Sequence, residues 1–129
     1  MTFNLKIPFL GFEDIKTMEL QKIDDVFARL TTSQRNDATF TLINPFILRD
    51  YQFEIPTQIE HLLQLDDAQE LLIYNTVVLN SKIEQSTINF AAPIIFNVTN
   101  KTMAQVILSN SDIYGIDEKL SSFLPKEQP

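Results

Sequence analysis

Apolar residues recur at every second position in short segments along most of the chain. Near the N-terminus, Phe3, Leu5 and Ile7 alternate with polar residues, and Pro8 ends the run. A repeat of two residues turns one face of a strand toward a core and the other toward solvent, so it predicts β-strands. Segments with this repeat, or with a short unbroken apolar run, cover residues 3–7, 18–22, 26–32, 39–43, 46–48, 51–55, 70–79, 86–90, 94–98 and 103–109.

Polar connections of hairpin length join several of these segments. The stretch SQRNDA (33–38) is rich in turn-forming residues, so it predicts a hairpin between 26–32 and 39–43. The stretches NSKIE (80–84) and TNK (99–101) connect later segments in the same way. We therefore expect neighbouring strands that run antiparallel.

One segment has the repeat of a helix. Residues 57–65, TQIEHLLQL, begin with Thr57 as a candidate N-cap, and Glu60 stands three residues on as its capping-box partner. The apolar face of this predicted helix consists of Ile59, Leu62 and Leu63.

These elements amount to about eight to ten short strands with one short helix, which is typical of a mainly β protein. We predict a small antiparallel β-barrel-like or sandwich domain. A chain of 129 residues fits one domain, and no linker or internal repeat divides it. We expect a single domain over residues 1–120, followed by a flexible C-terminal tail, SSFLPKEQP, over 121–129.

The charge balance is acidic, with 17 Asp and Glu against 10 Lys and Arg and a net charge of -7. Such a surface repels nucleic acid phosphates and attracts a basic protein. Asp66, Asp67 and Glu70 crowd the connection between the predicted helix and the next strand. We predict that they contact a basic partner; a solvated loop is the alternative.

The chain has no cysteine, which excludes disulfides, thiolate nucleophiles and cysteine-ligated metals. Its first residues lack the pattern of a secretory signal, and its apolar runs are too short for a membrane helix. We expect a cytoplasmic protein with no membrane partner. Asn97 and Asn100 begin Asn-x-Thr sequences, which we interpret as chance matches to the glycosylation pattern.

Residues for catalysis are scarce. His61 is the only histidine, and the nearby carboxylates do not share its helix face as metal ligands would. Gly11 and Gly115 are the only glycines, too few for a phosphate-binding or oxyanion loop. We predict no enzyme activity, no metal and no cofactor; a hydrolase built around His61 is a remote alternative.

The stretch TINFAAPIIFN (87–97) is the most apolar part of the chain, yet Asn89 and Pro93 interrupt it. We interpret it as two strands, 86–90 and 94–98, joined by a bend. Pro93 then stands at the start of a strand, where its missing N–H costs little. The side chain of Asn89 either holds the bend or contacts a partner.

Four stretches together resemble the FliW-type flagellar assembly factors. They are IPFLGFED (7–14), TFTLINPFILRDYQFEI (39–55), STINFAAPIIFN (86–97) and AQVILSNSDIY (104–114). They stand in the family's order, and the resemblance extends over about residues 3 to 120. The first turn departs from the family pattern, with Pro8 and Leu10 in place of a glycine and a proline.

The resemblance implies a mostly antiparallel β-barrel-like fold without catalysis. It also implies a cytoplasmic factor that binds flagellin as a chaperone and binds CsrA, an RNA-binding translational regulator. Binding CsrA relieves its repression of flagellin messages, and flagellin displaces CsrA by partner switching. A small-molecule-binding β-barrel module is the alternative. The candidate partner-binding residues are Asp66, Asp67, Glu70, Asn89, Pro93 and Tyr114.

Overall fold

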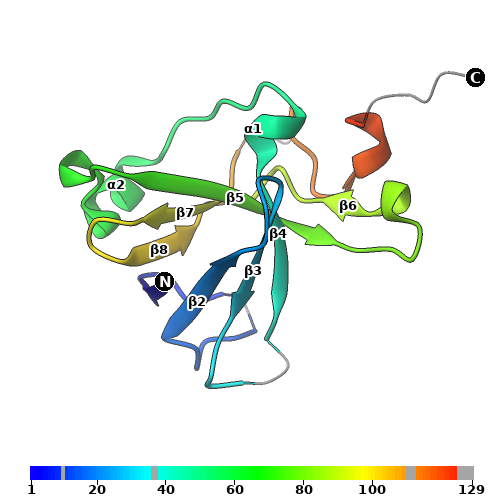
Figure 1. The fold of residues 1–129 in the computed structure, drawn as a ribbon. Coiled ribbons are helices and arrows are strands. Elements are labelled where there is room, and N and C mark those ends of the chain that lie inside the picture. Colours follow the sequence, from blue (N-terminus) through cyan, green and yellow to red (C-terminus); the bar gives the residue numbers. More distant parts are fainter. Residues whose placement is uncertain (10, 36–37, 110–112, 125–129) are drawn as a thin grey trace, which may run out of the picture.

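Nine strands of the described residues form one continuous sheet in the computed structural model of the chain (Figure 1). The structure describes residues 1–9, 11–35, 38–109 and 113–124. The strands are β1 (Thr2–Leu5), β2 (Thr17–Lys22), β3 (Phe27–Thr31), β4 (Phe40–Ile43), β5 (Leu71–Val78), β6 (Thr87–Ile88), β7 (Ile94–Asn97), β8 (Thr102–Gln105) and β9 (Glu118–Lys119).

Seven of these strands close into a barrel. The order is β4-β3-β2-β1-β8-β7-β5, and a further pairing of β4 with β5 completes the ring. Strands β6 and β9 extend the sheet outward from the C-terminal part of β5. The β1–β8 pair is parallel, and the other paired strands are antiparallel. The predicted fold class, a mainly β and barrel-like domain, is confirmed.

The interior of the barrel is filled by apolar side chains. Phe3 and Phe96, from strands far apart in the sequence, meet edge to face with ring centroids 5.0 Å apart. Because the residues that point inward alternate with outward ones, the sequence repeat of two residues identified this core. The interior positions that are at most 1% exposed include Phe3, Met18, Leu30, Leu42, Phe96 and Met103.

Helix α2 (Thr57–Leu63) covers the outer face of β7 and β8. The other helical segments are α1 (Pro45–Leu48), which contacts β5, and the single 3-10 turns η1 (Leu65–Asp67), η2 (Ile83–Gln85) and η3 (Leu120–Ser122). Ile59 and Leu63 of α2 pack with Ile95, Ala104 and Val106 in a second apolar cluster outside the barrel.

Two predicted strands are wrong. Residues 46–48 are helical because Pro45 presets the first helical position and the Asn44 side chain accepts a hydrogen bond from the Phe46 N–H at 3.0 Å. Residues 51–55 are assigned to no strand and pair with no neighbouring strand among the described residues.

The predicted helix exists, but its ends differ from the prediction. Pro56 occupies the N-cap position and no side chain caps the helix, so the Thr57–Glu60 capping box is absent. The helix ends at Leu63, because Gln64 takes a left-handed conformation with φ 54°. Leu62 is 38% exposed and does not share the buried face of Ile59.

The C-terminal part of the chain returns to the sheet. Strand β9 has only two residues, too few for a repeat to be recognised, and it pairs with β6. Of the predicted tail at 121–129, residues 125–129 lie outside the described residues. Phe123 packs edge-on against Phe90, with ring centroids 5.2 Å apart.

Candidate partner-binding surface

The three candidate acidic residues lie together at one corner of the molecule. Asp66 and Asp67 form most of η1, Glu70 directly precedes β5, and all three are exposed. We call this set the acidic corner. The left-handed Gln64 ends α2 and turns the chain into η1, which brings the carboxylates out at the end of the helix.

The end of α2 is fixed to the barrel by two asparagines. The carbonyl oxygen of Leu63 accepts hydrogen bonds from Asn97 Nδ2 at 2.8 Å and from Asn100 Nδ2 at 2.9 Å. Asn97 is the last residue of β7 and its side chain is buried, whereas Asn100 lies in the turn between β7 and β8. They satisfy a carbonyl that the helix end leaves free, which gives these asparagines a structural role.

Two further bonds hold the acidic corner to the same turn. The Gln69 N–H donates to Thr99 Oγ1 at 2.8 Å, and the Val98 N–H donates to the Glu70 carbonyl at 3.0 Å. The backbone of the acidic corner is therefore ordered before a partner binds, so less conformational entropy is lost on binding.

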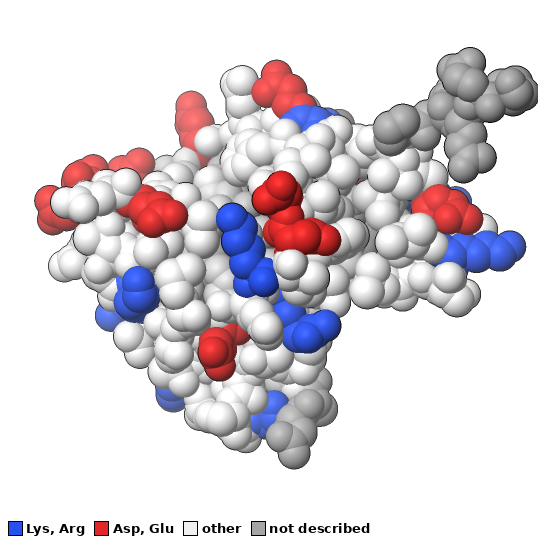
Figure 2. Space-filling model, viewed as in Figure 1, with Lys and Arg blue, Asp and Glu red and all other residues white. Residues whose placement is uncertain are grey.

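The acidic corner belongs to a long stretch without positive charge. Residues 50–81 contain no Lys or Arg. Figure 2 shows acidic side chains gathered over the end of the molecule where α2 meets β5 in Figure 1. This surface attracts a basic partner at long range. The acidic residues of the stretch are Asp50, Glu54, Glu60, Asp66, Asp67 and Glu70.

Asn89 holds the bend between β6 and β7. Its Oδ1 accepts a hydrogen bond from the Ala91 N–H at 3.0 Å, and its own carbonyl accepts one from Asn75 Nδ2 at 2.9 Å. Of the two roles that the sequence left open for Asn89, these bonds fit the one that holds the bend. The side chain is half-buried.

Pro93 and Tyr114 are both buried. Pro93 directly precedes β7, as predicted, and its carbonyl accepts a hydrogen bond from the Val106 N–H at 2.8 Å. Tyr114 is 6% exposed, and its hydroxyl bridges the N–H and carbonyl of Gln52, each at 2.9 Å. The structure thus brings the three acids together in one place and puts Asn89, Pro93 and Tyr114 in a separate, more buried region.

Tyr51 lies at the centre of that region. Its hydroxyl donates to the Phe90 carbonyl and accepts from Asn75 Nδ2 at 3.1 Å, and its ring lies 4.7 Å from the Tyr114 ring. Burial raises the pKa of Tyr51 to about 12. The network ties the 89–90 bend to the segment that follows α1.

Arg49 covers one side of this region. Its guanidinium lies 5.0 Å from the ring centroid of Phe90, 4.9 Å from that of Tyr114 and 5.2 Å from that of Phe123. Arg49 Nη1 also pairs with Glu118 Oε1 at 3.2 Å. Sequence analysis missed this residue, because its partners come from distant parts of the chain.

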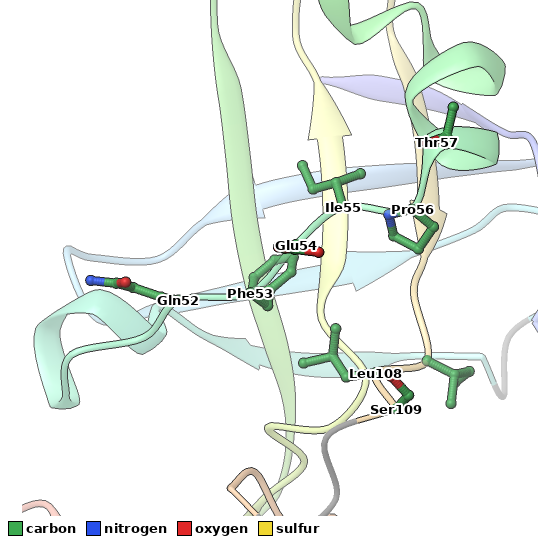
Figure 3. Close-up of a pocket in the computed structure, with 9 residues that line it drawn as sticks. Gln52, Phe53, Glu54, Ile55, Pro56, Thr57, Leu108 and Ser109 are labelled. Carbon is green, nitrogen blue, oxygen red and sulfur yellow. The ribbon is translucent and has the colours of Figure 1, made fainter.

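Sequence analysis also missed a groove of about 700 Å³ beside α2. One wall is the extended stretch Gln52–Thr57, and Ile107, Leu108 and Ser109 form the other (Figure 3). The sequence feature that could have indicated this groove is the strand-like pattern of residues 51–55. In the structure these residues are extended but pair with no strand among the described residues.

The described residues show neither a metal cluster nor a membrane helix. Within residues 1–9, 11–35, 38–109 and 113–124, no three His, Cys, Asp or Glu side chains converge as metal ligands. His61 lies exposed in the last turn of α2. In that same part of the chain, no helix is both long and apolar enough to cross a membrane.

Comparisons with known proteins give one consistent match. The family model described as FliW protein matches residues 1–120. The flagellar assembly factor FliW of Sulfurimonas denitrificans is 44% identical over 126 residues, covering 98% of this chain and all of that protein. The flagellar assembly factor FliW 2 of Wolinella succinogenes is 45% identical over 125 residues, covering 95% of this chain and 92% of that protein.

A solved structure gives the same fold. The crystal structure of a flagellar assembly factor FliW superimposes with a TM-score of 0.86, covering 98% of this chain and 88% of the other. The sequence identity in that comparison is 24%, so this likeness concerns the fold.

Proposed function

The chain belongs to the FliW family, and from this premise we propose that it is a cytoplasmic flagellar assembly factor that binds flagellin and CsrA. In this proposal it chaperones flagellin and antagonises repression of translation by CsrA. Flagellin that accumulates occupies the factor and frees CsrA, so the protein works by partner switching and carries out no catalysis.

The observation that carries the CsrA part of the proposal is the acidic corner. Its three carboxylates are exposed and belong to a stretch without Lys or Arg, and hydrogen bonds at Leu63 and Gln69 hold the backbone beside them. A protein that binds RNA presents basic side chains to phosphates. The acidic corner offers the same chemistry as those phosphates, which supports competition with RNA for CsrA.

The alternative function, a small-molecule-binding barrel, has less support. The described interior positions of the barrel are occupied by buried side chains such as Phe3, Phe96 and Met103. A ligand pocket in a small barrel needs interior space that these side chains fill. The family assignment also favours an assembly factor.

Titration tests the proposal directly. Fluorescently labelled protein is titrated with purified CsrA and with purified flagellin, first separately and then in competition. We expect saturable binding of each partner, and release of CsrA as flagellin is added. If neither partner bound at about 10 μM, the dissociation constants would be too high for the proposed complexes, and the proposal would be contradicted.

A further inference from the structure

Strand β1 pairs with one edge of β8, and past the end of this pairing the same edge has no neighbouring strand among the described residues. The Lys6 N–H donates to the Met103 carbonyl at 3.0 Å, which is the last described bond between the two segments. Beyond it, Val106 and Leu108 donate their N–H groups, each at 2.8 Å, to Pro93 and Ala91 on the opposite side. In an antiparallel ladder the intervening residue points its polar groups the other way. The N–H and carbonyl of Ile107 therefore face the open edge.

These backbone groups lack partners within the described residues. No hydrogen bond to the N–H or carbonyl of Ile107 occurs there, and the same holds for Phe53, Glu54 and Ile55 on the facing wall of the groove. Unpaired groups on an extended segment are a template for another strand. The groove of about 700 Å³ thus has backbone donors and acceptors on both walls.

Apolar side chains also line the groove, beside polar residues such as Gln52 and Ser109. Ile107 is 75% exposed, which is unusual for so large an apolar side chain next to a sheet edge. Phe53, Ile55 and Leu108 are partly buried and contribute to the walls. A ligand that satisfies the backbone and covers these side chains is an extended peptide with apolar residues at alternate positions.

Charge selects among such peptides. Glu54 is the one charged residue among the described residues that line the groove, and the wall that carries it belongs to the stretch 50–81, which has no Lys or Arg. The wall ends at Thr57, where α2 begins, and the acidic corner follows α2 after about 10 Å of helix. A basic peptide is attracted to this side, whereas a second copy of this chain, with its net charge of -7, is repelled.

We propose that this groove binds an extended peptide with alternating apolar and basic residues, which adds a strand to the open edge at Ile107–Ser109. The inference goes beyond the proposed function, because it fixes a binding mode that does not depend on flagellin or CsrA being the partner.

The test uses synthetic peptides of about nine residues and the full chain. The probe alternates valine with lysine. One control replaces each lysine by glutamate, and another carries N-methyl groups on alternate backbone amides, which blocks strand pairing while keeping side chains and charge. We expect saturable binding of the lysine peptide by calorimetry below about 1 mM, and at least about tenfold weaker binding of both controls.

Variants of the protein locate the site. Ile107→Lys places a positive charge at the edge and should weaken binding of the lysine peptide by about tenfold or more. Val78→Lys is the matched control, since Val78 is 71% exposed on β5 outside the groove, and it should leave the affinity unchanged. Circular dichroism checks that each variant is folded.

Amide chemical shifts complete the test. With the lysine peptide bound, changes should concentrate at residues 53–55 and 107–109. Equal binding of the N-methylated peptide, equal binding by the Ile107→Lys variant, or shifts away from the groove would overturn the proposal. So would absence of binding up to about 1 mM, or sedimentation as a dimer that Ile107→Lys converts to monomer. None of these results bears on the titrations with CsrA and flagellin.

Discussion

The side-chain amide of Asn97 donates a hydrogen bond to the carbonyl oxygen of Leu63 at 2.8 Å, and so ties the end of α2 to the β7–β8 turn. The other end of the same side chain accepts a hydrogen bond from the Thr99 N–H at 3.0 Å. One buried asparagine thus fixes both the turn and the helix that precedes the acidic corner.

Replacing Asn97 by alanine should lower the free energy of unfolding by about 1 to 3 kcal/mol, because the carbonyl of Leu63 loses a buried hydrogen-bond donor and the N–H of Thr99 loses its acceptor. Urea unfolding followed by circular dichroism measures the change. Asn100→Ala is the matched control; it removes the other donor to Leu63 from a less buried position and should cost about 1 kcal/mol or less. Equal losses in the two variants would contradict the role assigned to Asn97.

Tyr51 should make the protein sensitive to alkaline pH. Its pKa is near 10 in the unfolded chain and about 12 in the folded one, because burial disfavours the phenolate. Between these values the unfolded state binds fewer protons, so the free energy of unfolding is fully retained below pH 10 and falls as pH rises toward 12. The loss for this residue is about 3 kcal/mol.

Tyr51→Phe should reduce that dependence and also destabilise the protein at neutral pH by about 1 to 2 kcal/mol, since the hydroxyl bonds to Phe90 and Asn75 are lost. Urea midpoints at neutral and alkaline pH measure both effects. The control is Tyr74→Phe. Burial also raises the pKa of Tyr74, but its hydroxyl makes no hydrogen bond among the described residues, so its loss should cost less at neutral pH. If the free energy of unfolding of Tyr51→Phe fell between pH 10 and 12 as steeply as that of the unchanged protein, Tyr51 would not be the group responsible.

The sequence predicted the barrel well because its core consists of positions that alternate with solvent-facing ones. Phe3 on β1 and Leu42 on β4 belong to such segments, and both are fully buried. The prediction was wrong where the same residues fit the pattern of a strand and that of a helix. Residues 39–43 and 46–48 both have the pattern of strands, but Asn44 and Pro45 between them also suit the cap and first residue of a helix, which is what the structure shows.

The candidate surface was only partly predictable. The sequence placed Asp66, Asp67 and Glu70 in a connection, and they lie exposed in one. What holds that connection could not be predicted, because Asn97 lies 34 residues from its acceptor at Leu63. Likewise, a strand pattern at residues 51–55 says nothing of whether a partner strand exists, since pairing depends on where the β8 edge lies in space.

Arg49 should contribute to stability through geometry that lysine cannot reproduce. Its planar guanidinium lies over the rings of Phe90, Tyr114 and Phe123 while pairing with Glu118. Arg49→Lys keeps the charge but loses the stacking, so we expect a loss of about 1 kcal/mol in the free energy of unfolding. Thermal and urea unfolding measure it.

The matched control for Arg49 is Arg29→Lys, at an exposed position on β3, which should change stability by less than about 0.5 kcal/mol. A double-mutant cycle of Arg49→Lys with Glu118→Gln should give a coupling energy of about 0.5 to 1 kcal/mol. A coupling near zero would show that the ion pair contributes nothing beyond the ring contacts.

Charge reversal of the acidic corner should slow association with CsrA under the proposed function. Replacing its three carboxylates by lysine removes the long-range attraction, so the association rate at low salt should fall by about tenfold and depend less on salt, while the fold is kept. Stopped-flow fluorescence over a range of salt concentrations measures both quantities. The control makes the same change in net charge at exposed positions away from α2, with lysine at Glu19, Asp25 and Glu84. Because electrostatic steering depends on where charge lies as well as on its total, the control should slow association less; equal slowing in the two variants would remove the acidic corner as the site of contact.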